Sequence, residues 1–112
     1  MKPRLLAALV GLLLPLAVYA QDHFAGVGLV LAIHKDALTV IHVIPDSPAS
    51  RAGLSEGLLV RKIDGAVTEG KPLKDCVEMI RGAAGTKVKL ELFDASRNKT
   101  NTVELTREEI KT

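Results

Sequence analysis

The stretch at residues 43–65, VIPDSPASRAGLSEGLLVRKIDG, decides the fold of this chain. It begins as the end of a β-branched strand, and Pro45 closes that strand because proline fixes φ and has no N–H for a ladder. Ser47 can cap a helix from outside while Pro48 takes the first helical position. Gly53 then supplies a left-handed stop. The first half of the stretch therefore predicts a strand followed by a helix of about one to two turns.

The second half of the stretch predicts another strand and a sharp reversal. A turn at residues 55–57 leads into an apolar run at 58–63, which is typical of a strand. The Asp64-Gly65 dipeptide that follows is a strong signal for a tight turn.

Residues on the N-terminal side of this stretch predict a hairpin. Apolar residues alternate along 29–34, a period of two that favours a strand. The connection at 35–37 returns the chain into a second β-branched run at 38–44. Beyond the central stretch, residues 66–68 are short and extended, and 69–72 form a turn.

The C-terminal third predicts one longer helix and a second hairpin. Gly82 gives the helix a C-terminal stop. Strands are expected at 87–93 and 101–107, joined by a polar turn. The helical stripe at i, i+3, i+4 and i+7 consists of Leu73, Cys76, Val77 and Ile80.

The first twenty residues have the features of a secretory signal peptide. Lys2 and Arg4 make a basic start, an apolar run follows, and residues 18–20 form a small-x-small cleavage site. An uncleaved anchor is the alternative, although the run is short for a bilayer. We therefore expect a signal peptide at 1–20, a single domain at 21–112, and a periplasmic or secreted location.

The charge balance and the cysteine content exclude several classes of function and one kind of stabilisation. The chain has 15 Lys and Arg and 13 Asp and Glu, and removal of Lys2 and Arg4 leaves 13 of each sign. This balance argues against binding to nucleic acid or to an anionic membrane surface. Cys76 is the single cysteine, so an internal disulfide is impossible and a buried apolar role is expected.

The order of elements in residues 43–65 resembles the centre of a PDZ domain, in particular that of bacterial carboxyl-terminal processing (tail-specific) proteases. The family pattern is V-x-P-x-S-P-A-x-x-A-G-L-x-x-G-D-x-I-x-x-I-D-G. The chain departs from it at Leu58, where the family usually has Asp, and at Val60, where Ile is common. The matching residues are Val43, Pro45, Ser47, Pro48, Ala49, Ala52, Gly53, Leu54, Gly57, Ile63, Asp64 and Gly65.

This resemblance covers about residues 24–110 and implies an α+β, mainly β fold. The expected architecture is a PDZ-like, partly open antiparallel barrel of about five to six strands with one short and one longer helix. Periodicity alone leaves the strand order open, so the order rests on the resemblance.

The resemblance also implies a peptide-binding groove, in which loop amides receive a terminal carboxylate and an extended peptide adds as a strand. Gly26-Val27-Gly28-Leu29 matches the carboxylate loop, with the amides of Val27, Gly28 and Leu29 as donors, and Leu31 follows on the strand. An ordinary glycine loop is the alternative.

The longer helix is implied to form the other wall of the groove, through Leu73, Val77 and Ile80. Many animal PDZ domains carry a histidine where Leu73 stands, so a hydrophobic preference is expected at that ligand position. The alternative is that these three side chains serve only as core.

Catalysis and metal binding find little support in the sequence. The processing proteases use a Ser and Lys dyad in a separate domain, whereas the serines here fall in caps and turns. His23, His34 and His42 lack ligand-like spacing, so neither a metal nor a cofactor is predicted.

The favoured function is a non-catalytic secreted PDZ module that binds carboxyl-terminal or extended peptide segments of other envelope proteins. One alternative is an accessory or regulatory subunit of an envelope protease or secretion system that docks outside the groove. Another is the remnant of a processing protease.

Overall fold

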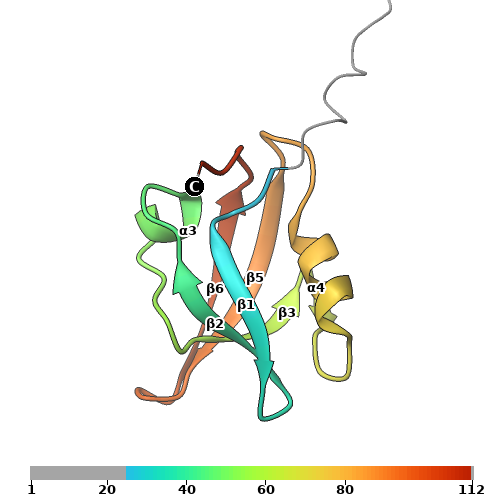
Figure 1. The fold of residues 1–112 in the computed structure, drawn as a ribbon. Helices are drawn as coiled ribbons and strands as arrows, with labels where there is room; N and C mark the ends of the chain where they lie inside the picture. Colours follow the sequence, from blue (N-terminus) through green and yellow to red (C-terminus); the bar gives the residue numbers. More distant parts are fainter. Residues whose placement is uncertain (1–24, 112) are drawn as a thin grey trace, which may run out of the picture.

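The computed structural model describes residues 25–111 (Figure 1). The signal peptide predicted at 1–20 lies outside the described residues, as does His23. The elements are β1 (Leu29–His34), β2 (Ala37–Val43), α3 (Pro48–Arg51), β3 (Leu59–Ile63), β4 (Ala66–Val67), α4 (Leu73–Ile80), β5 (Lys87–Asp94) and β6 (Lys99–Thr106).

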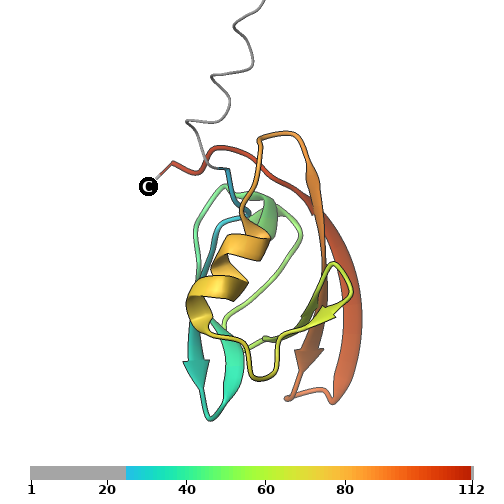
Figure 2. The same ribbon diagram turned by 90° about the vertical axis from the view of Figure 1, so that its right-hand side faces the viewer.

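The strands form one antiparallel sheet in the order β1-β2-β3-β5-β6, with β4 paired to β3. Figures 1 and 2 show that this sheet is curled, with α4 lying along β1 and α3 beyond the C-terminal end of β2. The mainly β fold with one short and one longer helix is thereby confirmed, as is each hairpin predicted from periodicity. The strand order places β1 at an edge of the sheet.

Two of the tight turns have the left-handed backbone that suits a two-residue hairpin loop. Lys35 and Asp36 have φ values of 52° and 64°, and Asp64 and Gly65 have values of 49° and 85°. Positive φ at both central residues matches the right-handed twist of the flanking strands. The Asp64-Gly65 reversal predicted from sequence is therefore correct.

Helix α3 forms through the capping residues expected from the sequence. The Ser47 hydroxyl donates to the Ile44 carbonyl over 2.7 Å and accepts from the Ser50 amide over 3.2 Å. Pro48 occupies the start of the helix, and Gly53 stands just beyond it with φ of 80°. Buried Ser47 thus fixes the direction in which the chain leaves β2.

Helix α4 ends differently from the prediction. Arg81 is already extended, with ψ of 159°, and Gly82 does not have the positive φ of a left-handed stop. Gly82 instead exchanges two backbone hydrogen bonds with Ala25, over 2.9 and 3.1 Å. A Cβ on Gly82 would lie 2.9 Å from Nε of Arg107, so glycine leaves room there for the Arg107 side chain.

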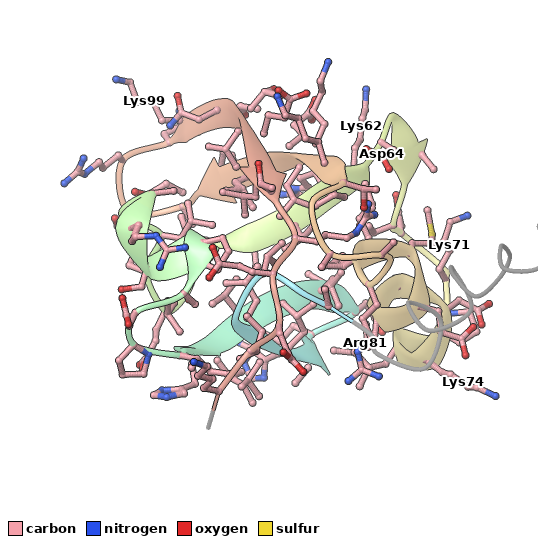
Figure 3. The ribbon with its side chains drawn as sticks, turned by 90° about the horizontal axis from the view of Figure 1, so that it is seen from above. Lys62, Asp64, Lys71, Lys74, Arg81 and Lys99 are labelled. Atoms are coloured by element: carbon pink, nitrogen blue, oxygen red, sulfur yellow. The ribbon has the colours of Figure 1, made fainter. Side chains whose placement is uncertain are left out.

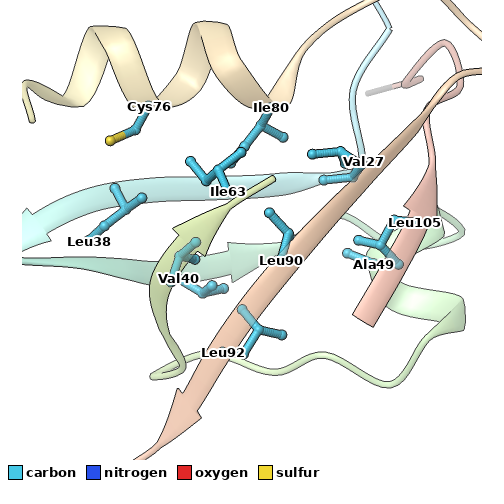
Figure 4. Packing of buried hydrophobic residues seen from close by; sticks show 12 residues of the cluster. Val27, Leu38, Val40, Ala49, Ile63, Cys76, Ile80, Leu90, Leu92 and Leu105 are labelled. Carbon is cyan, nitrogen blue, oxygen red and sulfur yellow. The ribbon is translucent and has the colours of Figure 1, made fainter. Parts of the chain in front are cut away.

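The core fills the space between the sheet and α4 (Figure 4). Ile63, Val88 and Leu90 are fully buried, and Cys76 and Ile80 add the inner face of α4. Val88, Leu90 and Leu92 occupy alternate positions of β5, as a half-buried strand requires. Within residues 25–111, neither helix has the length or apolar character to cross a membrane.

Candidate peptide groove

The free edge of β1 exposes backbone groups that could pair with another strand. The Ile44 amide donates to the Gly28 carbonyl over 2.8 Å. This bond flanks the Leu29–Val43 pair and makes it a non-hydrogen-bonded pair of the ladder. The N–H and C=O of Leu29 therefore point away from β2, toward the side on which α4 lies.

In the loop before β1, the carbonyls of Val27 and Gly28 are held and the amides of these two residues are unused. The Val27 carbonyl accepts from the Ala49 amide over 2.8 Å, and the Gly28 carbonyl accepts from Ile44. None of the described residues accepts a hydrogen bond from the amides of Val27 or Gly28. The scaffold therefore orients the loop as a set of donors, an arrangement that suits an anion.

The two glycines of this loop have different roles. Gly28 has φ of 89°, and a Cβ there would lie 2.1 Å from the Ser47 Oγ. Only glycine fits both the backbone and the space at this position. A Cβ on Gly26 would meet only Ile110, at an ordinary 3.9 Å. The loop geometry therefore depends on Gly28 and on its contact with the cap of α3.

A groove of about 370 Å³ lies between this loop, β1 and α4, and we call it the terminal groove. Helix α4 runs antiparallel to β1, because its C-terminal end is followed by Gly82, which pairs with Ala25. The lining residues are Ala25, Gly26, Val27, Gly28, Leu29, Leu31, Ile44, Val77, Ile80, Arg81 and Ile110.

The structure brings together most of the residues that were predicted from the sequence to line the groove. Leu73 is the exception, because it does not line the terminal groove and packs, partly buried, against the core. The lining residues not nominated from sequence are Ala25, Ile44, Arg81 and Ile110. Arg81 directly follows the helical stripe and could have been found from that spacing, whereas Ile110 reaches the groove only through tertiary packing.

The C-terminal segment holds the loop end of the groove in place. Arg107 donates from Nε to the Ile80 carbonyl over 2.7 Å and from Nη2 to the Met79 carbonyl over 3.2 Å. These bonds satisfy carbonyls at the end of α4, which have no partner within the helix. Glu108 exchanges backbone hydrogen bonds of 3.0 Å with Gly26, and its carboxylate pairs with Arg51 of α3.

A second cavity, of about 580 Å³, lies near the β1–β2 turn, and we call it the hairpin cavity. It mixes three basic with three acidic side chains and several apolar ones. Its lining residues are Lys35, Asp36, Ala37, Leu38, Leu59, Val60, Arg61, Lys62, Val67, Thr68, Glu69, Glu91, Phe93 and Thr100.

Two perturbed groups lie outside both cavities. Burial raises the pKa of the Cys76 thiol, which fits its packing in the core. A hydrogen bond from the Ser96 hydroxyl lowers the pKa of Asp94. Neither group faces the terminal groove, so neither supplies chemistry there. Among residues 25–111, no group of three or more potential metal ligands gathers.

The described residues form a six-stranded antiparallel sheet with an open edge, a helix (α4) beside that edge and an amide-bearing loop between the two. This is the architecture of a PDZ domain. A family model described as "PDZ domain" matches residues 39–92. The chain therefore contains a PDZ domain, similar to those of bacterial carboxy-terminal processing proteases.

Individual relatives support this identification. The carboxy-terminal-processing protease of Bartonella bacilliformis is 32% identical over 91 residues, which cover 81% of this chain and 21% of that protein. The PDZ domain of a carboxy-terminal protease from Vibrio cholerae, solved in complex with peptide, is 27% identical with a TM-score of 0.73. That match covers 80% of this chain and 98% of the domain.

A photosystem II D1 C-terminal processing protease gives the same TM-score of 0.73 at 29% identity, covering 79% of this chain and 24% of that one. Across the curated relatives described, the matched region spans between 14 and 23% of their length. What this chain shares with these proteases is therefore their PDZ module.

Proposed function

We propose that this protein is a non-catalytic, secreted PDZ module that binds carboxyl-terminal or extended peptide segments of other envelope proteins in the terminal groove. The observation that carries the proposal is the loop at Val27 and Gly28, whose carbonyls are held by the scaffold while its amides have no acceptor among residues 25–111. These donors lie beside an open strand edge, which is the arrangement that β-augmentation requires.

The walls of the groove favour apolar ligand side chains. Val77 and Ile80 face it from α4, and Leu29 and Leu31 face it from β1. A peptide that pairs with β1 places alternate side chains against these surfaces. The similar PDZ domain of the Vibrio cholerae carboxy-terminal protease was solved in complex with peptide, which supports peptide binding as the function of this domain.

The secreted location is part of the proposal. It is supported by the basic start, apolar run and small-x-small site in residues 1–20. Mass spectrometry of the protein from the envelope fraction would test it, and a mature N-terminus at Gln21 is expected. Recovery of the intact chain with Met1 in the cytosol would contradict it.

The binding proposal is tested with a pool of acetylated pentapeptides that end in Ala, Val, Leu or Ile, each made as the free acid and as the amide. Backbone amide shifts report the titration, and dissociation constants of about micromolar or weaker are expected because few side chains are buried. The free acids should shift the amides of Val27, Gly28 and Leu29 and bind more tightly than the amides. No shift at millimolar peptide would contradict the proposal.

A second candidate is an accessory or regulatory subunit of an envelope protease. The favouring observation is that the curated relatives carry this module within proteases. Co-purification of a protease with the tagged protein would support this role, and it should persist in a variant whose groove no longer binds peptide. A protein that isolates alone under crosslinking would contradict it.

A further inference from the structure

Arg81 is the one charged residue in the lining of the terminal groove among the residues that the structure describes. Every other lining residue is apolar or glycine. A cation at the rim of an otherwise uncharged groove selects for a ligand that brings a negative charge to the same place.

The backbone places Arg81 at the loop end of the groove. It is the residue after Ile80, the last of α4, and the residue before Gly82, whose backbone pairs with Ala25. Ala25 in turn lies two residues before Val27, whose amide is a candidate carboxylate donor. Arg81 and the unused loop amides therefore converge on one end, while Leu31 lies farther along β1.

The Arg81 side chain is available for a ligand. Arg81 is exposed, and its guanidinium makes no hydrogen bond or ion pair within residues 25–111. The Arg81 backbone amide donates to the Val77 carbonyl over 3.1 Å. By contrast, the guanidinium of Arg107 donates hydrogen bonds to carbonyls at the end of α4. Figure 3 shows Arg81 among the basic side chains around α4, with Lys71 and Lys74.

We infer that Arg81 pairs with the terminal carboxylate of the bound peptide and makes recognition of a free carboxyl terminus dependent on charge. This inference rests on the proposed function of the groove and adds a residue that sets its specificity. Loop amides donate to a neutral carbonyl and, more strongly, to a carboxylate, and the full charge of a guanidinium adds to this discrimination. Arg81 is therefore expected to carry much of the preference for free acids over amides.

The test uses the tightest-binding member of the pentapeptide pool, as free acid and as amide, with the full protein and three variants. In Arg81→Gln, affinity for the free acid should fall about fivefold at low salt, while affinity for the amide stays unchanged. Arg81→Lys should retain most of the preference. Lys74→Gln, which removes an exposed charge from the same helix outside the lining, should change neither affinity.

Salt provides a second readout. The difference between the protein and Arg81→Gln should shrink as ionic strength rises, because the partly exposed pair is screened. An unchanged ratio of free-acid to amide affinity in Arg81→Gln would overturn the inference while leaving the groove proposal intact. Equal loss for both peptides would also overturn it, since it would assign Arg81 a packing role. Absence of any binding by the unmodified protein would overturn the proposed function, and the inference with it.

Discussion

The terminal groove and the hairpin cavity differ in how their polar groups are used, and the larger cavity is the less suited to a ligand. In the hairpin cavity, Lys62 pairs with Glu91 over 3.8 Å and the Arg61 guanidinium lies 5.0 Å from the centre of the Phe93 ring. The buried Thr68 hydroxyl donates to the Val60 carbonyl over 2.6 Å. Much of its polar surface is therefore already engaged within the protein.

The terminal groove shows the opposite arrangement. Its walls are apolar, and the polar groups at its loop end, two amides and one guanidinium, have no acceptor among residues 25–111. Groups that are preorganised and unpaired can give their full interaction to a ligand, whereas paired groups must first break a contact. Unused donors, rather than volume, therefore distinguish the proposed binding surface from the other cavity of this domain.

Substitution of Gly28 is expected to have the largest effect, because the loop geometry of the terminal groove depends on this residue. Gly28→Ala should lower the free energy of unfolding by at least about 3 kcal/mol, since the positive φ and the overlap with Ser47 add together. Urea unfolding followed by circular dichroism measures the change. Gly26→Ala is the matched control and should cost less than about 0.5 kcal/mol. Equal losses for the two variants would contradict the different roles of these glycines.

A pair of arginine substitutions compares the supports of the two cavities. Arg107→Met removes the hydrogen bonds to the Met79 and Ile80 carbonyls beside the groove and should cost about 2 kcal/mol of unfolding free energy. Arg61→Met removes the contact with Phe93 at the hairpin cavity and should cost about 0.5 kcal/mol. Thermal and urea unfolding measure both changes. A larger loss of unfolding free energy in Arg61→Met than in Arg107→Met would contradict the prediction that Arg107 contributes more to stability.

Two valine substitutions test which of the two cavities binds peptide. Val77→Asp places a carboxylate on the apolar wall of the groove and should weaken free-acid peptide binding about tenfold, or about 1.4 kcal/mol. Val67→Asp makes the same change at a half-exposed residue of the hairpin cavity and should leave binding within about twofold. Peptide titrations followed by amide shifts measure both. Weaker binding in Val67→Asp alone would move the site to the hairpin cavity.

Local signals predicted the elements well because their causes are local. The Ser47 hydroxyl caps α3 by accepting a hydrogen bond from the amide of Ser50, three residues along the chain. The turn at Asp64-Gly65 is set by the φ angles of those two residues. The stripe of Cys76, Val77 and Ile80 follows from helical spacing alone. Gly82 misled the prediction because a glycine near a helix end also satisfies a close approach by a distant side chain, here Arg107.

From the residues alone, the order of strands, turns and helices followed, together with the PDZ resemblance, the glycine loop and the apolar face of α4. Backbone conformation and periodicity depend on neighbours in the chain, so they can be read locally. Only the tertiary structure decided that Leu73 packs on the core, that Ile110 reaches the groove and that Arg81 is its single charge among the described residues. Those facts depend on contacts between segments far apart in the chain, which no local pattern encodes.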